Sequence, residues 1–588
     1  MEQQTTTNWL PELTWENLDA VMAERLQATR NGHTVVPMLW QGLWKLPVHV
    51  GEQTRSATVY LPKDIPQGSP FVFLNVPQGW QTEAFLRKSG WIGLADERQF
   101  CLFAAEPEQG GWKTPEEERP YLKACYHAET YGAYCMPHLS SYLVGYGQIG
   151  LEVHKLVIED PLFVAAAAFL DASDLEEDVL AAYQQKEYHF APETITMPLR
   201  EIPVPVWICS QRVDARTRAL ADYWIAAAHA RETGRNAVYG IQYRQQEALY
   251  FTPEGNILEV DLQQARKDYA DPYTTRAICG FLFRYHRYGR GSRSNQISRK
   301  VDQQKLGVQV HYFVDPNGIP REYLVYMPES CQGKGRVPLV LALHGASQSM
   351  RNMFDNSMWY QKARQEGFIV VMAESGLGKV PRDLQGEQPL SYRPVWHDVS
   401  NAEEGADLSY LEALVDRLMQ QYPVDSRRMY LTGHSMGCMT SLYVGTSAVA
   451  NRFAAIAATS GIAAREAAGT QERRPGVPVF LTMGEYDLWS YDLACETGLT
   501  RALDFYLKDN GLADEEHVKD LRRNGAKEQV CGKFHDYLWA DAAGVPRVRY
   551  SWIQGWGHVN LLEPNIRFWD EWFSKWSLDE AGDRHYNP

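Results

Sequence analysis

Short hydrophobic runs, each closed by glycine or polar residues, recur in the same order in both halves of the chain. In the first half they occupy residues 56–62, 70–77, 99–106, 142–150, 163–170 and 204–210. In the second half they occupy residues 321–328, 337–345, 368–374, 428–433, 453–460 and 477–483. Short runs that are apolar throughout are typical of strands buried on both faces of a parallel sheet. The pattern predicts two α/β units in tandem, each with a mostly parallel sheet flanked by helices.

The order of these runs suggests a repeat, because Pro70 and Tyr142 of the first half match Pro338 and Tyr430 of the second. The alternative is that parallel strands resemble one another in any α/β protein. We assign residues 1–290 to the first unit, 291–304 to a polar, glycine-rich linker and 305–588 to the second unit. A helix is expected over Thr14–Thr29, and residues 497–539 are expected to form a cap-like insert in the second unit.

One run of the second half ends in a Gly-x-Ser-x-Gly sequence around Ser435 and continues as a sequence that can form a helix. This pattern is typical of a sharp strand–turn–helix, in which Gly433 and Gly437 leave room for close backbone contacts. The turn would lift the Ser435 hydroxyl above the sheet edge and leave the Met436 amide at the helix N-terminus. The Gly-x-Ser-x-Gly motif alone also fits a glycine-flanked surface turn, so the rest of the chain must decide between the two interpretations.

A serine nucleophile needs a general base and an acid that orients the base. Four histidines follow Ser435, namely His517, His535, His558 and His585. We choose His558, because it follows an expected strand at 548–553 through a glycine-rich turn and precedes an amphipathic helix. The acid should follow the preceding strand, where Glu485 and Asp487 stand. Asp487 is preferred because it lies farther past the strand end, and Glu485 is the rival.

Backbone amides near the serine could stabilise a negatively charged oxygen in a transition state. Met436 supplies one such amide, and the turn after the run at 337–345 should supply another. Gly345 and Ala346 are the candidates in that turn. His344 precedes them, and we expect it to support this loop and to border the substrate.

The second unit resembles the polyhydroxybutyrate depolymerase and feruloyl esterase group of α/β hydrolases over about residues 305–577. The resemblance is carried by His344-Gly345, Trp396, Asp407–Leu411, Tyr422–Tyr430 and Thr432–Gly437. It implies hydrolysis of carboxylic esters through an acyl-enzyme, with Ser435 as nucleophile, Asp487 as acid and His558 as base. It also implies that Trp396 and His434 contact the substrate, although core packing explains Trp396 equally well. Feruloyl-type or hydroxyalkanoate esters are the expected substrates.

Two other classes of protein remain open. One is a serine peptidase with a similar sheet, and the other is a binding protein built on hydrolase folds. For the first unit, the sequence favours a binding protein. Gly147 occupies the position that matches Ser435, and Pro77, which lacks an amide hydrogen, occupies the position that matches Gly345. Asp214 matches Asp487, but no histidine occurs at the position that matches His558. We expect a degenerate, non-catalytic, hydrolase-like copy.

Composition narrows the choice of partners. The chain of 588 residues has a net charge of −15, which argues against binding to nucleic acid. Its nine cysteines form no CxxC pair, and the start has no basic region followed by an apolar run. We therefore expect reduced thiols, no secretory signal and a cytoplasmic location. The longest apolar run, Leu162–Leu170, is too short to cross a bilayer, so no membrane contact is expected.

No metal-binding or nucleotide-binding motif occurs in the sequence, so we expect no metal and no cofactor. The expected partner is a small-molecule or oligomeric ester. A homodimer is an arrangement that the sequence leaves open.

Overall fold

The structure is a computed structural model of the chain. It describes residues 8, 9, 20, 41–63, 65, 69–126, 140–190, 195–246, 259–288, 296–346, 348–381, 390–400, 406–464 and 472–588. These residues form two compact units, the first ending at residue 301 and the second beginning at residue 302. The expected helix at Thr14–Thr29 lies outside the described residues, except for Ala20.

The first unit is built around a ten-stranded sheet, as counted over the described residues. Its strands are β1 (Gly42–Val50), β2 (Gln53–Leu61), β3 (Phe71–Asn75), β4 (Cys101–Ala105), β5 (Ser141–Tyr146), β6 (Ala166–Leu170), β9 (Val206–Ser210), β10 (Ala230–Asn236), β11 (Gly240–Gln245) and β12 (Glu259–Gln264). Its helices are α2 (Thr82–Lys88), α3 (Trp91–Arg98), α4 (Pro115–Tyr126), α6 (Gly147–Glu159), α7 (Glu177–Gln184), α8 (Ala215–Ala227) and α9 (Pro272–Leu282). Two small hairpins, β7 (Glu187–Phe190) with β8 (Ile195–Pro198) and β13 (Tyr285–Tyr288) with β14 (Gln296–Arg299), stand outside the sheet.

The second unit also contains a ten-stranded sheet among its described residues. Its strands are β15 (Gln309–Val314), β16 (Pro320–Tyr326), β17 (Val337–Leu343), β18 (Ile369–Ala373), β21 (Val424–Gly433), β22 (Ala455–Thr459), β23 (Val479–Tyr486), β24 (Lys527–Cys531), β25 (Phe534–Ala540) and β26 (Pro546–Gly557). Its helices are α10 (Met350–Ser357), α11 (Trp359–Glu366), α12 (His397–Ser400), α13 (Ala406–Gln421), α14 (Met436–Gly445), α15 (Gly498–Asp509), α16 (Val518–Asn524) and α17 (Leu562–Glu571). Two further hairpins are β19 (Gly376–Pro381) with β20 (Leu390–Val395) and β27 (Trp576–Leu578) with β28 (Arg584–Tyr586).

The two sheets have the same topology, position for position. The first has the order β1-β2-β4-β3-β5-β6-β9-β12-β11-β10, and the second has β15-β16-β18-β17-β21-β22-β23-β26-β25-β24. In both, the six strands from the third to the eighth position run parallel and the outer strands run antiparallel. The six runs that the sequence matched between the halves occupy equivalent strands. The predicted fold class of two tandem, mostly parallel α/β sheets flanked by helices is confirmed.

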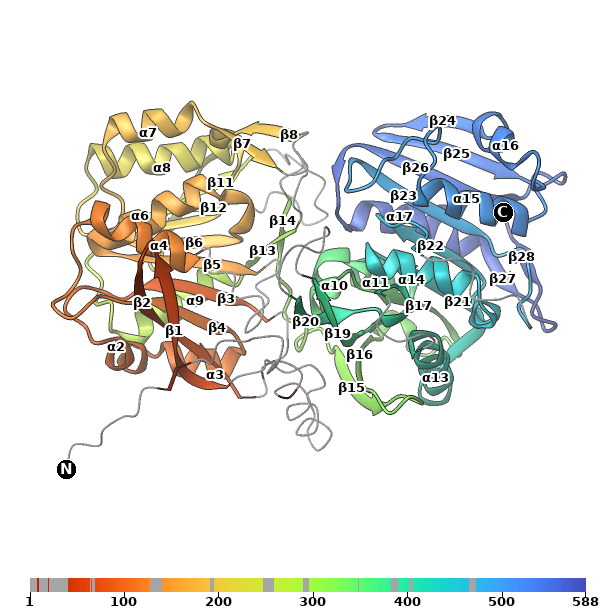
Figure 1. Cartoon of the computed structure of the whole chain (residues 1–588), viewed down its shortest axis with the longest axis horizontal. Helices are drawn as coiled ribbons and strands as arrows, with labels where there is room; N and C mark the ends of the chain where they lie inside the picture. Colours follow the sequence, from red (N-terminus) through yellow and green to blue (C-terminus); the bar gives the residue numbers. More distant parts are fainter. Residues whose placement is uncertain are drawn as a thin grey trace. The chain divides into compact units, whose positions relative to one another are not determined.

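Helices cover both faces of the second sheet because its central strands are apolar on both sides (Figure 1). Leu339 and Leu341 of β17 join a core that includes residues of α13, α14 and α15. The other face carries Tyr430 of β21, whose ring centroid lies 4.8 Å from that of Phe573 and 5.9 Å from that of Trp569. Each fully buried large apolar side chain stabilises the fold by roughly 1.5–3 kcal/mol.

The expected linker at 291–304 is wrong in part. Residues Gln296–Arg299 form β14, which pairs antiparallel with β13 of the first unit. The Lys300 amide then donates to the Arg284 carbonyl over 2.8 Å. The described residues up to 301 therefore belong to the first unit, while 289–295 lie outside the described residues.

The expected cap at 497–539 is also wrong. Its helix α15 turns Leu499, Leu503 and Tyr506 into the main core, because apolar residues at helical spacing form one face. The Tyr506 hydroxyl donates to the Leu442 carbonyl of α14 over 2.8 Å. Strands β24 and β25 extend the main sheet, with β25 antiparallel to β26. The segment is thus part of the α/β unit.

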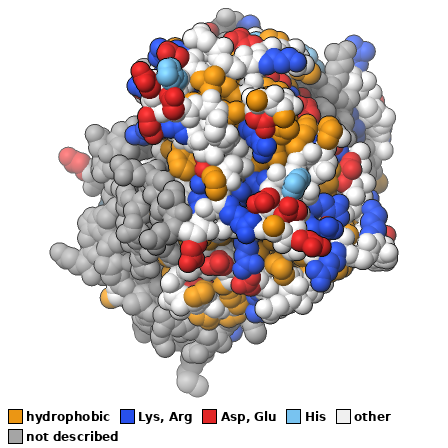
Figure 2. All heavy atoms as spheres, turned by 90° about the vertical axis from the view of Figure 1, so that its right-hand side faces the viewer, with side chains coloured by type: hydrophobic (Ala, Val, Ile, Leu, Met, Phe, Trp, Pro, Cys, Tyr) orange, Lys and Arg blue, Asp and Glu red, His pale blue; other side chains and the backbone are white. Residues whose placement is uncertain are grey.

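The edge strand β24 is exposed along its whole length, and Val530 exposes 64% of its surface. Charged residues such as Lys527 and Glu528 are typical of sheet edges, because they discourage pairing with other strands. On the face of the second unit seen in Figure 2, acidic and basic side chains alternate with hydrophobic ones.

Candidate active site

Ser435 stands in a sharp turn between β21 and α14. Its φ of 54° and ψ of −119° lie in a region that residues other than glycine rarely adopt. Such a conformation costs on the order of 1–3 kcal/mol and persists only where the surroundings impose it. Here the His434 amide donates to the Leu343 carbonyl and the Ser435 amide to the Thr459 carbonyl, both over 3.1 Å. Two neighbouring strands thus hold the turn that presents the serine.

The glycines on either side of Ser435 are required by close backbone contacts. A Cβ on Gly433 would lie 2.2 Å from the Gly437 carbonyl oxygen. A Cβ on Gly437 would lie 2.1 Å from the Leu343 carbonyl oxygen. Any side chain at these positions would push strand and helix apart, which explains the spacing seen in the sequence.

Ser435, His558 and Asp487 form a continuous hydrogen-bonded line. Ser435 Oγ lies 2.8 Å from His558 Nε2, and His558 Nδ1 lies 2.8 Å from Asp487 Oδ1. A carboxylate only accepts hydrogen bonds, so Nδ1 carries the imidazole hydrogen and Nε2 is left to accept the Ser435 hydroxyl. The Asp487 side chain is fully buried, whereas the His558 side chain exposes 16% of its surface. The imidazole therefore stands between a buried acid and a solvent-accessible serine.

The sheet brings these three residues together although they are far apart in the sequence. Ser435, Asp487 and His558 closely follow the carboxyl ends of β21, β23 and β26. These strands run in one direction in the same sheet, so their ends meet at one edge. Tyr486 pairs with Gly557 in the register of β23 and β26, which places Asp487 beside His558.

Glu485, the rival acid, has a different partner. Its Oε2 accepts the Gly555 amide over 2.8 Å and so holds the glycine turn that precedes His558. Asp487 has the imidazole contact and also accepts the Leu488 amide over 2.7 Å. Of the two carboxylates, Asp487 alone contacts His558 within the described part of the chain.

The expected oxyanion donors are backbone amides in the two turns beside Ser435. The expected donor Gly345 is wrong, because its amide donates to Gln348 Oε1 over 3.0 Å. The amides of Ala346 and Met436 have no acceptor among the described residues, and both residues are partly exposed. A Cβ on Gly345 would lie 3.0 Å from Ser435 Cβ, so this turn lies directly against the serine.

The three expected substrate-binding residues are all buried, which contradicts direct contact with a substrate. His344 exposes none of its surface, and its ring is held by the Gly345 carbonyl at 2.8 Å and the Ser375 amide at 3.1 Å. Trp396 is equally buried and donates from its indole nitrogen to the His344 carbonyl over 2.8 Å. His434 exposes 1% of its surface, with its ring centroid 4.8 Å from that of His558. The core-packing alternative for Trp396 is the one that the structure supports.

Sequence reasoning missed Trp489, two residues past Asp487. Its ring meets the His558 ring edge-on, with the centroids 5.3 Å apart, and the side chain is half-buried. The available signal was an aromatic residue two positions after the expected acid. Burial also raises the pKa of the Cys438 thiol in α14, so this neighbour of Ser435 stays a neutral thiol.

The matching edge of the first unit is built differently. Gly147 begins α6 with a φ of 61°, close to the 54° of Ser435, and supplies no hydroxyl. Asp214, the match of Asp487, accepts the Thr217 amide over 3.0 Å and caps α8. Pro77 stands where Gly345 stands, as expected.

No cluster of three or more histidine, cysteine, aspartate or glutamate side chains within the described ranges could hold a metal ion. Within the same ranges, every helix is too short or too polar to cross a membrane. The eight cysteines that the structure describes are free thiols, and Cys495 and Cys531 are exposed.

Comparison with known proteins links the second unit to ester hydrolases. Residues 318–529 match the Esterase family, described as "Putative esterase". The chain is 31% identical over 266 residues to the bifunctional acetylxylan esterase/xylanase XynS20E of Neocallimastix patriciarum, covering 45% of this chain and 34% of that protein. It is 25% identical over 142 residues to acetylxylan esterase A of Emericella nidulans, covering 24% of this chain and 42% of that protein.

Among solved structures, the acetyl xylan esterase from Aspergillus awamori aligns with a TM-score of 0.31 and 14% identity, covering 45% of this chain and 99% of that one. Of the two curated relatives named above, XynS20E and acetylxylan esterase A of Emericella nidulans, the chain spans less than half the length in each case. The expected resemblance to esterases is confirmed for the second unit.

Proposed function

We propose that the second unit is a serine hydrolase of carboxylic esters that works through an acyl-enzyme. The observation that carries the proposal is the unbroken line of two 2.8 Å contacts from Ser435 through His558 to buried Asp487. The match of residues 318–529 to the Esterase family gives independent support for ester hydrolysis.

In the first half of the reaction, His558 Nε2 removes the Ser435 hydroxyl proton while the oxygen attacks the ester carbonyl carbon. The carbonyl oxygen becomes negatively charged and accepts hydrogen bonds from the Ala346 and Met436 amides. Asp487 stabilises the imidazolium that forms and keeps its Nδ1–H oriented. The imidazolium then gives its Nε2 proton to the alcohol oxygen, the carbon–oxygen bond breaks, and the acyl group stays on Ser435.

In the second half, water takes the place of the departed alcohol. His558 Nε2 removes a proton from this water, whose oxygen attacks the acyl carbon. The same two amides stabilise the second tetrahedral intermediate. Its collapse returns the proton to Ser435 Oγ and releases a carboxylic acid, which restores the starting state.

Half-buried hydrophobic residues near Ser435 support a proposal for the substrate class. Met436 follows Ser435, the Met439 amide donates to the Ser435 carbonyl over 3.0 Å, and the Trp489 ring packs against that of His558. Such a border favours an apolar or aromatic acyl group, as in hydroxycinnamoyl or hydroxyalkanoate esters. The names of the relatives add acetylated xylan to the candidates. We further propose that the first unit does not hydrolyse esters, because Gly147 supplies no nucleophile.

An active-site probe and a substrate panel test the proposal together. A fluorophosphonate should label the intact chain at Ser435, as read by peptide mass spectrometry, and p-nitrophenyl acetate should be hydrolysed. Methyl ferulate, hydroxybutyrate oligomers and acetylated xylan then rank the acyl groups. Hydrolysis of peptide anilides with no turnover of any ester would replace the proposal with a peptidase. Neither labelling nor turnover would favour a binding protein.

A further inference from the structure

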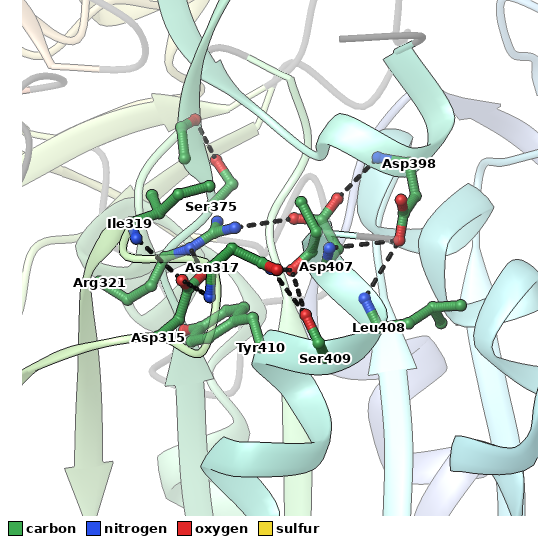
Figure 3. A network of polar contacts seen from close by, with 12 residues as sticks. Asp315, Asn317, Ile319, Arg321, Ser375, Asp398, Asp407, Leu408, Ser409 and Tyr410 are labelled. Carbon is green, nitrogen blue, oxygen red and sulfur yellow. Dashed lines mark hydrogen bonds and ion pairs between the residues drawn. The ribbon is translucent and has the colours of Figure 1, made fainter. Parts of the chain in front are cut away.

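A group of charged side chains is fully buried in the second unit beside β16 (Figure 3). Arg321 donates from Nε to Asp315 Oδ2 over 3.0 Å and from Nη2 to Asp407 Oδ1 over 3.2 Å. None of these three side chains is exposed. The Arg321 guanidinium also lies 4.4 Å from the ring centroid of Tyr410. Buried ion pairs add little net stability, because removing the charges from water offsets their attraction. A role in fixing the positions of neighbouring elements would explain this cluster better than a contribution to stability.

Asp407 ties α13 to α12 through two reciprocal contacts with Asp398 (Figure 3). The Asp398 amide donates to Asp407 Oδ2 over 2.9 Å, and the Asp407 amide donates to Asp398 Oδ2 over 3.2 Å. The Leu408 amide reaches the same Asp398 oxygen over 3.1 Å. The Asp398 carboxylate thus caps the first turn of α13, where the helix dipole favours a negative charge. The α13 amides thus offset the charge of Asp398, whereas burial raises the pKa of Asp407.

The short helix α12 connects this cluster to the turn beside Ser435. Trp396 directly precedes α12 and lies two residues before Asp398. Its buried indole donates to the His344 carbonyl over 2.8 Å, and the centroids of the Trp396 and His344 rings lie 5.4 Å apart. The His344 carbonyl belongs to the peptide that leads into Gly345 and Ala346. The position of α12 therefore sets the position of that peptide.

The turn of Gly345 and Ala346 needs this support because the Ala346 amide must reach the ester carbonyl oxygen at hydrogen-bond distance. A Cβ on Gly345 would lie only 3.0 Å from Ser435 Cβ, so a shift of the turn changes its relation to the nucleophile at once. Displacing a catalytic group by about 1 Å can lower the rate by about a hundredfold. Donors that act on the transition state change kcat more than KM.

We propose that Asp398, held by Asp407 and Arg321, is a positioning residue for the oxyanion turn and acts through the Trp396 indole on the His344 carbonyl. The inference rests on the proposed ester hydrolysis by Ser435. Its consequence is that the Trp396 N–H, which touches no substrate, affects the rate of the chemical step.

The decisive variant is Trp396→Phe in the full chain, which removes the indole N–H and keeps a buried aromatic ring. We expect kcat for p-nitrophenyl acetate to fall between about tenfold and a hundredfold with KM nearly unchanged. Active enzyme is counted by titrating Ser435 with a fluorophosphonate, so that misfolded protein does not enter kcat. The matched control is Trp359→Phe, because Trp359 is equally buried and its indole nitrogen has no partner among the described residues. This control should keep kcat.

The role of Asp398 is tested by Asp398→Ala, Asp398→Asn and the double variant with Trp396→Phe. The alanine should lower kcat by about as much as Trp396→Phe, because both act on the same carbonyl. The asparagine should restore most of kcat, since its amide oxygen can still accept from α13. If Asp398 acts through Trp396, the double variant should be no slower than the slower single variant.

Unchanged kcat in Trp396→Phe, or an equal loss in Trp359→Phe, would overturn the inference. Multiplying losses in the double variant would remove the link from Asp398 to Trp396. These results differ from a failure of the proposed function, in which the unaltered chain itself turns over no ester. If Asp398→Ala does not fold, the two tryptophan variants still decide whether the Trp396 N–H affects kcat.

Discussion

His558 Nδ1 lies 2.8 Å from Asp487 Oδ1, on the opposite side of the imidazole from Ser435. Glu485, two residues earlier than Asp487, instead accepts the Gly555 amide. Two acids that the sequence left in competition thus have separate tasks: Asp487 contacts the imidazole, and Glu485 holds the backbone that leads to it.

This division of roles predicts unequal effects of two conservative changes. Asp487→Asn should lower kcat/KM by about 10⁴-fold, because an amide favours the wrong imidazole tautomer. Glu485→Gln should cost less than about tenfold, since the glutamine oxygen can still accept from Gly555. Steady-state kinetics of both variants on p-nitrophenyl acetate provide the measurement, each serving as control for the other. A greater loss in Glu485→Gln would show that the acid is misassigned.

The turn around Ser435 should not tolerate a methyl group at Gly437. Gly437→Ala places a Cβ 2.1 Å from the Leu343 carbonyl oxygen, which backbone movement must relieve. We expect a loss of about 1–3 kcal/mol in the free energy of unfolding together with a large loss of activity. Gly93→Ala in α3 is the control, because nothing lies within 4 Å of its added Cβ. Equal melting temperatures and activities for the two variants would contradict this account of the turn.

The first unit should stay inactive even with a serine in its turn. Gly147→Ser supplies a hydroxyl at a position with nearly the φ of Ser435. The matching acid, Asp214, caps α8, so no acid–base pair would activate that hydroxyl. In a Ser435→Ala background, esterase activity should therefore remain at the level of Ser435→Ala alone. Recovery to a hundredth of the wild-type rate would mean that the first unit retains catalytic groups.

Asp261 in β12 should make the stability of the first unit depend on pH. Both of its carboxyl oxygens are buried without a partner among the described residues, and burial together with nearby Glu259 raises its pKa to about 8. In the unfolded chain an aspartate has a pKa of about 3.9. Between these values the unfolded chain loses the proton while the folded chain keeps it, so stability falls as pH rises.

Asp261→Asn removes this titration without changing the shape of the side chain. Its melting temperature should exceed that of the wild type by more at pH 8 than at pH 5. Scanning calorimetry at the two pH values gives both differences. An equal difference at both would indicate that Asp261 is already ionised at pH 5 in the folded chain.

The central strands of both units could be predicted from the sequence, because each is apolar on both faces and ends at a turn. The outer strands could not, and β24 shows why: all five of its residues are exposed, so they carry no hydrophobic alternation. The cap was predicted wrongly because α15 follows a long loop, and only tertiary packing reveals that its apolar face enters the main core.

The site divides in the same way. Ser435 and His558 could be singled out from the sequence because backbone constraints leave glycines at fixed spacing around them. Asp487 could be ranked above Glu485 but not separated from it, since the choice depends on the Gly555 amide in another strand. Gly345 was predicted as a donor because nothing local shows that the Gln348 side chain takes its amide. For Trp396 the sequence left substrate contact and core packing open, because nothing local shows that its indole donates to the buried His344 carbonyl.

The most direct test is the value of kcat/KM for p-nitrophenyl acetate in full-length Ser435→Ala, measured beside the wild type after both are shown to have the same melting temperature. Removing the nucleophile of a Ser–His–Asp triad can lower kcat by about 10⁶-fold. The account predicts a loss of at least about a thousandfold. A variant that kept more than a tenth of the wild-type value would contradict the assignment of Ser435 as the nucleophile.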